Sequence, residues 1–332
     1  KWSVDLAGSV DTAPAIGSDG TIYTTTEEGP LYAIDSNGSV LWSRDLGITL
    51  NSNPVLDSKN NIYVSNKKGM VFSLNSKGRE RWRYNTGLST VPGVSLDDDG
   101  KVYVSAGNLL VLDTHGTLLY KFSMESDVFT TVRAPVVDEN GNIYFPCSYR
   151  LYYLKPDGKE IWNYSIDDSD YRLIVDKLDG KLYVRWGNTL SALNTAGEEL
   201  WKFNAKVAYG GPVISSEGTI YLPTGDGLVA VSSTGQQLWA SDDSGNGSTP
   251  AVGANGTILY ASNKALFAFN KSGAILWQYE LVEDLSSPTI ASDGTVYIGT
   301  YDGMKALATN CGGVDTGPWP LFGRNIRNTG SW

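Results

Sequence analysis

An aromatic residue recurs along this chain of 332 residues at intervals of 38 to 42 residues. Seven of the eight positions hold tryptophan and one holds tyrosine: Trp2, Trp42, Trp82, Tyr120, Trp162, Trp201, Trp239 and Trp277. A fixed period of this length is typical of stacked supersecondary units, none of which buries its apolar face without a neighbour. The chain is therefore expected to fold as an array of units of about 40 residues.

Each unit contains four short strand patterns separated by tight turns. In the first unit we expect strands over residues 12–17, 21–25, 31–34 and 40–44. Val, Ile, Tyr and Thr alternate in these runs as in half-buried strands, and most turns are Asx-Gly pairs that accept the positive φ of hairpins. No window shows a sustained apolar period of about 3.6 residues, so almost no helix is expected. Four-stranded units of about 40 residues, repeated radially, are the blades of a β-propeller.

The number of blades follows from the first strand of each unit, which is led by proline in all units but one. The eight leading residues are Pro14, Pro54, Pro92, Pro135, Leu173, Pro212, Pro250 and Pro288. Proline is tolerated there because the first residue of a strand can leave its N–H position unpaired. The sequence therefore predicts an all-β fold, an eight-bladed β-propeller of four-stranded antiparallel blades.

The propeller ring is expected to close through the N-terminal strand. Residues 1–6 (KWSVDL) match the fourth strand of a unit, whereas the last unit supplies only three clear strands, which end near Ala308. Pairing the N-terminus with the last unit leaves no open ring edge. The alternative is that Trp319, 42 residues after Trp277, provides this strand, although prolines flank it on both sides.

A longer pattern surrounds the recurring aromatic residue. Residues 31–35 (LYAID), Gly38 and residues 41–42 (LW) return as residues 266–269 (LFAF), Gly273 and residues 276–277 (LW). This pattern resembles the tryptophan-docking repeat of pyrroloquinoline quinone (PQQ)-like, quinoprotein-type β-propellers, over about nine tenths of the chain. The tail at residues 318–330 also resembles the WPMFxxxxxxTG segment that accompanies such repeats in secreted and cell-surface proteins. The resemblance implies that each recurring aromatic residue packs onto the neighbouring blade.

The resemblance is specific for the fold and says much less about the ligand. The family includes quinoprotein dehydrogenases, an outer-membrane assembly lipoprotein that is purely a scaffold, and many surface proteins. Its dehydrogenases are generally much longer, carry a vicinal cysteine pair, and use calcium and a catalytic aspartate. This chain has no adjacent cysteines. We therefore expect no cofactor, with PQQ and calcium as the alternative.

Composition limits the classes of partner and the cellular compartment that we expect. A net charge of −10 disfavours nucleic acid, whose binding rests on basic patches. The sequence has no transmembrane run and no signal peptide, and the resemblance implies an extracellular, cell-surface or periplasmic location. Cys147 and Cys311 fall on opposite sides of an eight-fold ring, so free thiols are expected. We expect a monomer with one propeller domain over residues 1–310 and a tail over residues 311–332 that packs on it.

The residues that catalysis or metal binding would require are sparse. His115, the only histidine, precedes a turn glycine, so a solvated turn residue is expected rather than a catalytic base. The run from Asp97 to Gly100 lacks the glutamate that a calcium loop needs at its twelfth position and is expected to be a hairpin turn. The pairs at residues 242–243 and 283–284 lie in connections between blades, where carboxylates are usually solvated. No catalytic or metal-binding residue is predicted.

One sector departs from the repeat. The connection from Tyr120 to Pro135 spans 15 residues, whereas the others span 10 to 12, and the nearby loops of blades three to five are rich in arginine and aromatic residues. Loops on a rigid scaffold often carry function, and Arg with aromatic residues is the composition of binding hot spots. The predicted ligand-binding residues are Phe129, Arg133, Tyr149, Arg150, Tyr171, Arg172, Arg185 and Trp186. The alternative is that drift in a repeat array produces irregular loops without function.

These observations predict a non-catalytic binding or scaffold propeller. It would recognise a protein segment or an anionic saccharide on the loop face of blades three to five. The alternative is a PQQ- or metal-dependent enzyme, similar to quinoprotein dehydrogenases, that uses the same face.

Overall fold

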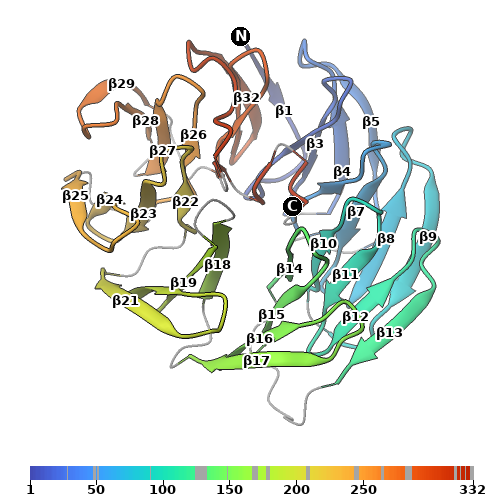
Figure 1. The fold of residues 1–332 in the computed structure, drawn as a ribbon. Coiled ribbons are helices and arrows are strands. Elements are labelled where there is room, and N and C mark those ends of the chain that lie inside the picture. Colours follow the sequence, from blue (N-terminus) through green and yellow to red (C-terminus); the bar gives the residue numbers. More distant parts are fainter. Residues whose placement is uncertain are drawn as a thin grey trace. The chain divides into compact units, whose positions relative to one another are not determined.

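The computed structural model describes most of the chain, and all of its regular structure is β-strand. The described residues are 1–27, 29–47, 50, 52–89, 91–123, 133–147, 149–166, 171–176, 180–206, 210–242, 247–262, 265–280, 286–317, 320–321, 323–325 and 327–329. The description leaves out the side chains of residues 171, 175 and 176. Within these ranges no helix is present, and the strands form eight antiparallel sheets of four strands (Figure 1). The predicted all-β, eight-bladed propeller is confirmed.

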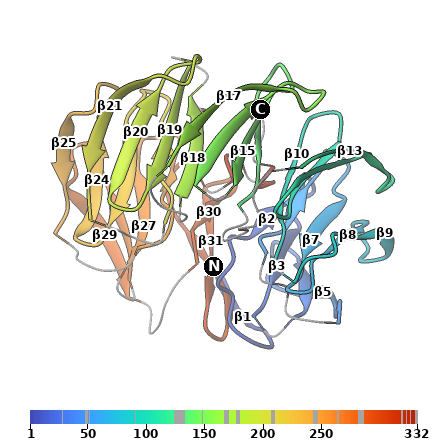
Figure 2. The same ribbon diagram turned by 90° about the horizontal axis from the view of Figure 1, so that it is seen from below.

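In seven of the eight blades the four strands follow one another in chain order, as Figure 2 shows for β18 to β21. The first strands are β2 (Ala15–Ile16), β6 (Val55–Leu56), β10 (Gly93–Leu96), β14 (Val136–Val137), β18 (Tyr171–Asp176), β22 (Val213–Ile214), β26 (Ala251–Val252) and β30 (Thr289–Ile290). The second strands are β3 (Ile22–Thr25), β7 (Ile62–Ser65), β11 (Val102–Ser105), β15 (Ile143–Cys147), β19 (Lys181–Trp186), β23 (Ile220–Thr224), β27 (Ile258–Ser262) and β31 (Thr295–Thr300).

The outer half of each blade consists of its third and fourth strands. The third strands are β4 (Leu31–Ile34), β8 (Met70–Leu74), β12 (Leu109–Leu112), β16 (Arg150–Leu154), β20 (Thr189–Leu193), β24 (Gly227–Val231), β28 (Ala265–Phe269) and β32 (Gly303–Ala308). The fourth strands are β5 (Val40–Arg44), β9 (Glu80–Asn85), β13 (Leu118–Phe122), β17 (Glu160–Ser165), β21 (Glu199–Asn204), β25 (Gln237–Ala240), β29 (Ile275–Glu280) and, in blade eight, β1 (Trp2–Asp5).

The N-terminal strand completes blade eight. β1 pairs antiparallel with β32, from Trp2 opposite Ala306 to Asp5 opposite Gly303 (Figure 1). A side chain at Gly303 would meet the carbonyl oxygen of Val4, so glycine is required at the end of this pairing. The prediction that the N-terminal strand closes the last blade is confirmed. The alternative strand at Trp319 lies outside the described residues.

The core lies between neighbouring blades. One cluster joins Tyr23, Leu31 and Ala33 of the first blade to Ile62 and Phe72 of the second, all almost completely buried. The second and third strands are buried along most of their length, whereas the outer strands alternate between exposed and half-buried residues. A single blade therefore buries its apolar face only against the next one.

Four of the recurring tryptophans contact the turn between the third and fourth strands of the next blade. Their indole Nε1 atoms donate to backbone carbonyl oxygens: Trp42 to Ser76 (3.0 Å), Trp82 to Thr114 (3.0 Å), Trp201 to Ser233 (3.1 Å) and Trp239 to Lys271 (2.8 Å). The ring covers the turn glycine, and a Cβ added at Gly235 would lie 2.7 Å from Cδ2 of Trp201. The docking role of the eight aromatics as a source of stability remains a prediction.

A buried tyrosine on the second strand accompanies the aromatic residue of the same blade. The ring centroids lie 5.7 Å apart for Tyr183 and Trp201 and 5.9 Å apart for Tyr221 and Trp239. This pairing could be inferred from the sequence, because a tyrosine precedes most of the recurring tryptophans by 18 or 19 residues. Tilted aromatic pairs at this distance contribute beyond their buried area.

The buried tyrosines predict a loss of stability in alkali. Burial, with a smaller contribution from nearby carboxylates, raises the pKa of Tyr23 and of Tyr221 to about 12, and raises the pKa of Tyr103 further. Tyrosine in the unfolded chain ionises near pH 10, whereas these buried side chains stay protonated in the folded protein up to about pH 12. Their contribution to the free energy of unfolding is therefore fully present below about pH 10 and is lost as the pH rises toward 12. In this pH window each such tyrosine should lower the free energy of unfolding by about 1 kcal/mol for every pH unit.

Absorbance of the phenolate during a pH titration checks this prediction. The buried tyrosines should ionise together with loss of the circular dichroism signal, above the pH at which tyrosine ionises in an unfolded chain. A single titration of all tyrosines near pH 10 in the folded protein would contradict it.

Contacts within the chain define two compact units. One comprises Lys1–Pro14 and Tyr171–Ile326, and the other comprises Ala15–Asp170 and Arg327–Trp332. The C-terminal tail has described contacts in each. In the first unit, Val252 N donates to Pro320 O at 2.8 Å, and Leu321 is fully buried. In the second, Leu56 N donates to Arg327 O at 2.9 Å. The predicted boundary between propeller and tail at residue 310 remains a prediction.

Candidate functional site

The turn between β15 and β16 presents two of the predicted site residues to solvent. Tyr149 is 50% exposed, and Arg150 beside it is also exposed. Arg150 Nη1 donates to Asn163 Oδ1 at 2.7 Å, and Asn163 Nδ2 donates to Glu160 Oε1 at 2.7 Å. Asn163 lies on β17, the strand next to β16, so the blade itself orients the guanidinium. The other donors of Arg150 make no hydrogen bond within the described residues.

The connection that precedes blade four is described only at its end. Phe129 lies outside the described residues. Arg133 is half-buried, and a Cβ added at Gly93 would lie 2.5 Å from its carbonyl carbon. The backbone of Arg133 therefore passes close to the first residue of β10, and only glycine leaves room for it there.

Arg185 and Trp186 correct the sequence prediction. They were expected in an exposed loop between the second and third strands, but both belong to β19. Arg185 is 3% exposed and Trp186 is 6% exposed. Lys202 Nζ lies 5.9 Å from the centroid of the Trp186 ring, where a cation is attracted to the aromatic face. Neither residue can serve as a solvent-exposed contact of a binding loop.

The first strand of this blade is longer than in most blades, and leucine stands there in place of the repeat proline. Leu173 can donate its N–H, so β18 extends over six residues, whereas most other first strands have two. The longer ladder pairs Tyr171 with Trp186, Arg172 with Arg185 and Leu173 with Val184. The place of Arg185 and Trp186 in the sheet follows the repeat itself, because the second strand also extends three residues past its tyrosine in β15 (to Cys147) and β23 (to Thr224).

Arg172 lies opposite Arg185 in this ladder. Residues directly opposite in an antiparallel pair project to the same face of the sheet, so the two arginines share one face. The aliphatic part of Arg172 packs on Gly211, with Cγ 3.5 Å from the Cβ position there. Only the backbone of Tyr171 is described, and it pairs with Trp186.

The structure thus brings the predicted residues together in two groups, and in the second group Tyr171 and Trp186 are the pair next to Arg172 and Arg185. Tyr149 and Arg150 adjoin at one turn of the unit that contains blades one to four. Arg172 and Arg185 adjoin in the first blade of the other unit. A single site that contains both groups remains a prediction.

The other chemistry-bearing residues lie in turns. The His115 side chain is 84% exposed and its backbone N–H donates to Asp113 Oδ1 at 2.8 Å. Asp97 accepts from Lys101 N and from the Tyr103 hydroxyl, both at 2.8 Å, in the hairpin turn between β10 and β11. Asp242 is described in a connection between blades, whereas residues 243, 283 and 284 lie outside the described residues. His115 and Asp97 therefore lie in turns, as the sequence analysis expected.

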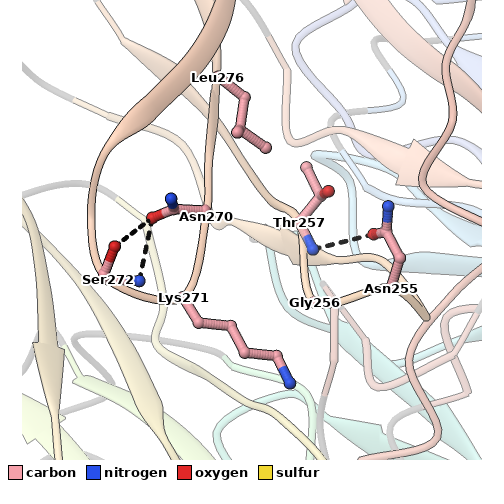
Figure 3. Close-up of a pocket in the computed structure, with 7 residues that line it drawn as sticks. All are labelled: Asn255, Gly256, Thr257, Asn270, Lys271, Ser272 and Leu276. Atoms are coloured by element: carbon pink, nitrogen blue, oxygen red, sulfur yellow. Dashed lines mark hydrogen bonds between the residues drawn. The ribbon is translucent and has the colours of Figure 1, made fainter.

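A shallow pocket lies between two turns of blade seven. Its volume is about 410 Å³, and Figure 3 shows Asn255, Gly256 and Thr257 facing the turn of Asn270, Lys271 and Ser272. Asn270 Oδ1 accepts from Ser272 N at 3.0 Å and from Ser272 Oγ at 2.8 Å. Lys271 Nζ forms an ion pair with Glu217. The polar groups of the pocket mainly form hydrogen bonds within their own turns. The described lining residues include no acid, base or nucleophile pair suited to catalysis.

A sequence profile now places the chain in a family. The profile described as outer membrane protein assembly factor BamB matches residues 1–119, 47–184 and 186–314. The chain belongs to this family. No curated protein matches the sequence significantly. The BamB-family profile agrees with the predicted PQQ-like repeat.

Solved structures with the same fold include several kinds of protein. BamB from Moraxella catarrhalis is 18% identical, with a TM-score of 0.75 over 92% of this chain and 98% of that chain. A europium-containing methanol dehydrogenase is 14% identical, with a TM-score of 0.75 over 90% and 84% of the two chains. The computationally designed Ika8 protein is 15% identical, with a TM-score of 0.77 over 92% and 98%. At these identities the similarity shows the fold alone.

The described residues do not supply the donors that PQQ with calcium would need. Calcium takes six to eight oxygen ligands, usually including several carboxylates. The described part of the chain contains no group of three or more His, Cys, Asp and Glu residues that could hold a metal ion. Cys147 and Cys311 are buried and form no disulfide among the described residues. Among the described residues, no helix is long and apolar enough to cross a membrane.

Proposed function

We propose that this BamB-family propeller is a non-catalytic scaffold that binds a segment of a partner protein at the turn of Tyr149 and Arg150. The description of the family as an assembly factor supports a protein partner and a periplasmic or outer-membrane location. Arg133 and Phe129, which the sequence analysis grouped with this turn, are proposed as neighbouring contacts.

The observation that carries the proposal is the oriented Arg150 beside an exposed tyrosine. Arg and Tyr are the residues most enriched at binding hot spots. The hydrogen bond to Asn163 fixes the guanidinium before binding, so less side-chain entropy is lost on association. The remaining donors of Arg150 suit a carboxylate or a backbone carbonyl of the partner.

The second candidate function is the quinoprotein-like enzyme, favoured only by the shared fold of the methanol dehydrogenase. The absence of a carboxylate cluster in the described residues is the reason to place it second. An anionic saccharide at the same turn is the other alternative, because a guanidinium also binds carboxylated sugars.

Site-specific photocrosslinking in the native cell tests the scaffold proposal. A photoreactive phenylalanine analogue at position 149 should capture one discrete partner, and Arg150→Ala should reduce the yield about tenfold or more, as expected for a hot spot. The matched control places the analogue at Tyr301, which is 67% exposed in the corresponding turn of blade eight and should capture nothing specific.

Two results would contradict the proposal. Equal capture at positions 149 and 301 would show that exposure alone determines the yield. Dye reduction with alcohols or sugars after addition of PQQ and calcium would favour the enzyme.

A further inference from the structure

Blade two carries a charge opposite to that of the rest of the chain. Residues 51–90 contain seven basic residues and two acidic ones, a net charge of +5. The basic residues are Lys59, Lys67, Lys68, Lys77, Arg79, Arg81 and Arg83. The remainder of the chain holds 19 basic and 34 acidic residues, a net charge of −15. The overall acidity of the protein therefore conceals one basic blade.

Most of these cations have no carboxylate partner among the described residues. Arg83 pairs with Glu80 and lies over the Phe72 ring, and Arg81 donates to Ser73 Oγ and to the Thr114 carbonyl. The other five are exposed and form no ion pair within the described ranges: Lys59, Lys67, Lys68, Lys77 and Arg79. Such a concentration of like charge has an unfavourable self-energy that an anionic partner would relieve.

The cations extend along the outer half of the blade. Lys67 and Lys68 occupy the turn from β7 to β8 at one end, and Lys77 and Arg79 occupy the turn from β8 to β9 at the other. The two turns are separated by β8, whose five residues span about 17 Å. Arg83 lies between them on β9 and its side chain is 59% exposed. The result is a narrow basic stripe parallel to β8 and β9.

The outer edge of β9 indicates which class of anionic partner fits the basic stripe. β9 is the last strand of its blade and pairs only with β8, so its outer edge offers backbone N–H and C=O groups. A bulge at Arg81 limits the regular part of this edge to Trp82–Asn85. Only a polypeptide can match these groups by strand addition, whereas a saccharide or a lipid headgroup cannot.

The charge outside blade two also limits the size of the partner. A broad anionic surface, such as a membrane or a nucleic acid, would also come within a Debye length of the acidic blades one and three and be repelled. A short extended segment would contact the stripe alone. We propose that blade two binds an extended acidic segment of a partner protein, which adds to the outer edge of β9 and places carboxylates against Lys67, Lys68, Lys77 and Arg79.

Fluorescence anisotropy with a labelled Glu-Val alternating peptide of about ten residues tests this surface. The unmodified protein should bind the peptide, and Lys77→Glu/Arg79→Glu should weaken binding about tenfold or more because both partners then carry negative charge. Raising NaCl from about 0.05 to 0.15 M should weaken binding to the unmodified protein. The matched control, Lys121→Glu/Lys155→Glu, makes the same change in net charge on blades three and four and should leave affinity within about twofold.

Each comparison can overturn the proposal. An equal loss in the control pair would show a response to net charge rather than to the stripe. Equal binding of a peptide with proline at alternate positions would exclude strand addition. Binding of phosphatidylglycerol vesicles or of an oligogalacturonate without binding of the peptide would replace the protein segment with a lipid or a saccharide. Tyr149 and Arg150 take no part here, so either proposal can fail while the other stands.

Discussion

Replacing Trp201 with alanine should lower the free energy of unfolding by about 3 kcal/mol, the lower end of the usual loss for a buried aromatic residue, because Trp201 is half-buried. The ring covers Gly235, packs on Tyr183 and donates to the Ser233 carbonyl, so the variant loses contacts both within its blade and with the next one. Urea denaturation followed by circular dichroism measures the change. An unchanged midpoint would contradict the docking role of the recurring tryptophans.

Variants at Tyr120 provide the matched comparison. Its ring covers Gly158, at 3.1 Å from the Cβ position, but its buried hydroxyl makes no hydrogen bond within the described residues. Tyr120→Phe should therefore be neutral or slightly stabilising. Tyr120→Trp should be tolerated, because the other blades accommodate an indole whose N–H reaches a turn carbonyl.

Deletion of residues 1–6 should have the other large effect. It removes β1, exposes the edge of β32 and removes the Trp2 ring from Tyr297, which lies 5.8 Å away. An unpaired edge beside an opened apolar interface promotes association between chains. We expect the truncated protein to aggregate or to unfold at clearly lower urea concentration, as measured by size-exclusion chromatography and denaturation.

The variant Lys1→Ala removes the ion pair of the N-terminal strand but keeps the strand itself, and so distinguishes the two effects. Lys1 Nζ lies 2.9 Å from Asp293 Oδ2 at an exposed position, and such pairs contribute about 0–1 kcal/mol. This variant should remain monomeric and nearly as stable as the unmodified protein. A stable, monomeric protein without residues 1–6 would show that blade eight does not depend on β1.

The period of the aromatic residues was sufficient to predict the blades. In blade one the observed strands Leu31–Ile34 and Val40–Arg44 coincide with the ranges expected from turn spacing. The first strand is shorter than expected because Pro14 has no N–H to extend the ladder. Repeats are predictable to this degree because each unit must satisfy the same packing against its neighbour.

The candidate site was predicted less well than the blades. Arg185 and Trp186 were assigned to a loop because the length of the second strand was underestimated: β19 extends to Trp186, as β15 extends to Cys147 at the equivalent position. Sequence position placed Tyr149 in the turn, whereas Arg150 is the first residue of β16, and its hydrogen bond to Asn163 joins neighbouring strands and cannot be inferred from spacing. The basic blade was readable from local charge counts and was hidden by the net charge of −10.

Amide hydrogen exchange tests the scaffold account most directly. The protein is compared alone, with a synthetic copy of the segment that crosslinks to position 149, and with PQQ and calcium. The account predicts slower exchange in the hairpin of β15 and β16 with the segment and no change with PQQ. Slower exchange with PQQ and calcium, together with no effect of the segment, would contradict it.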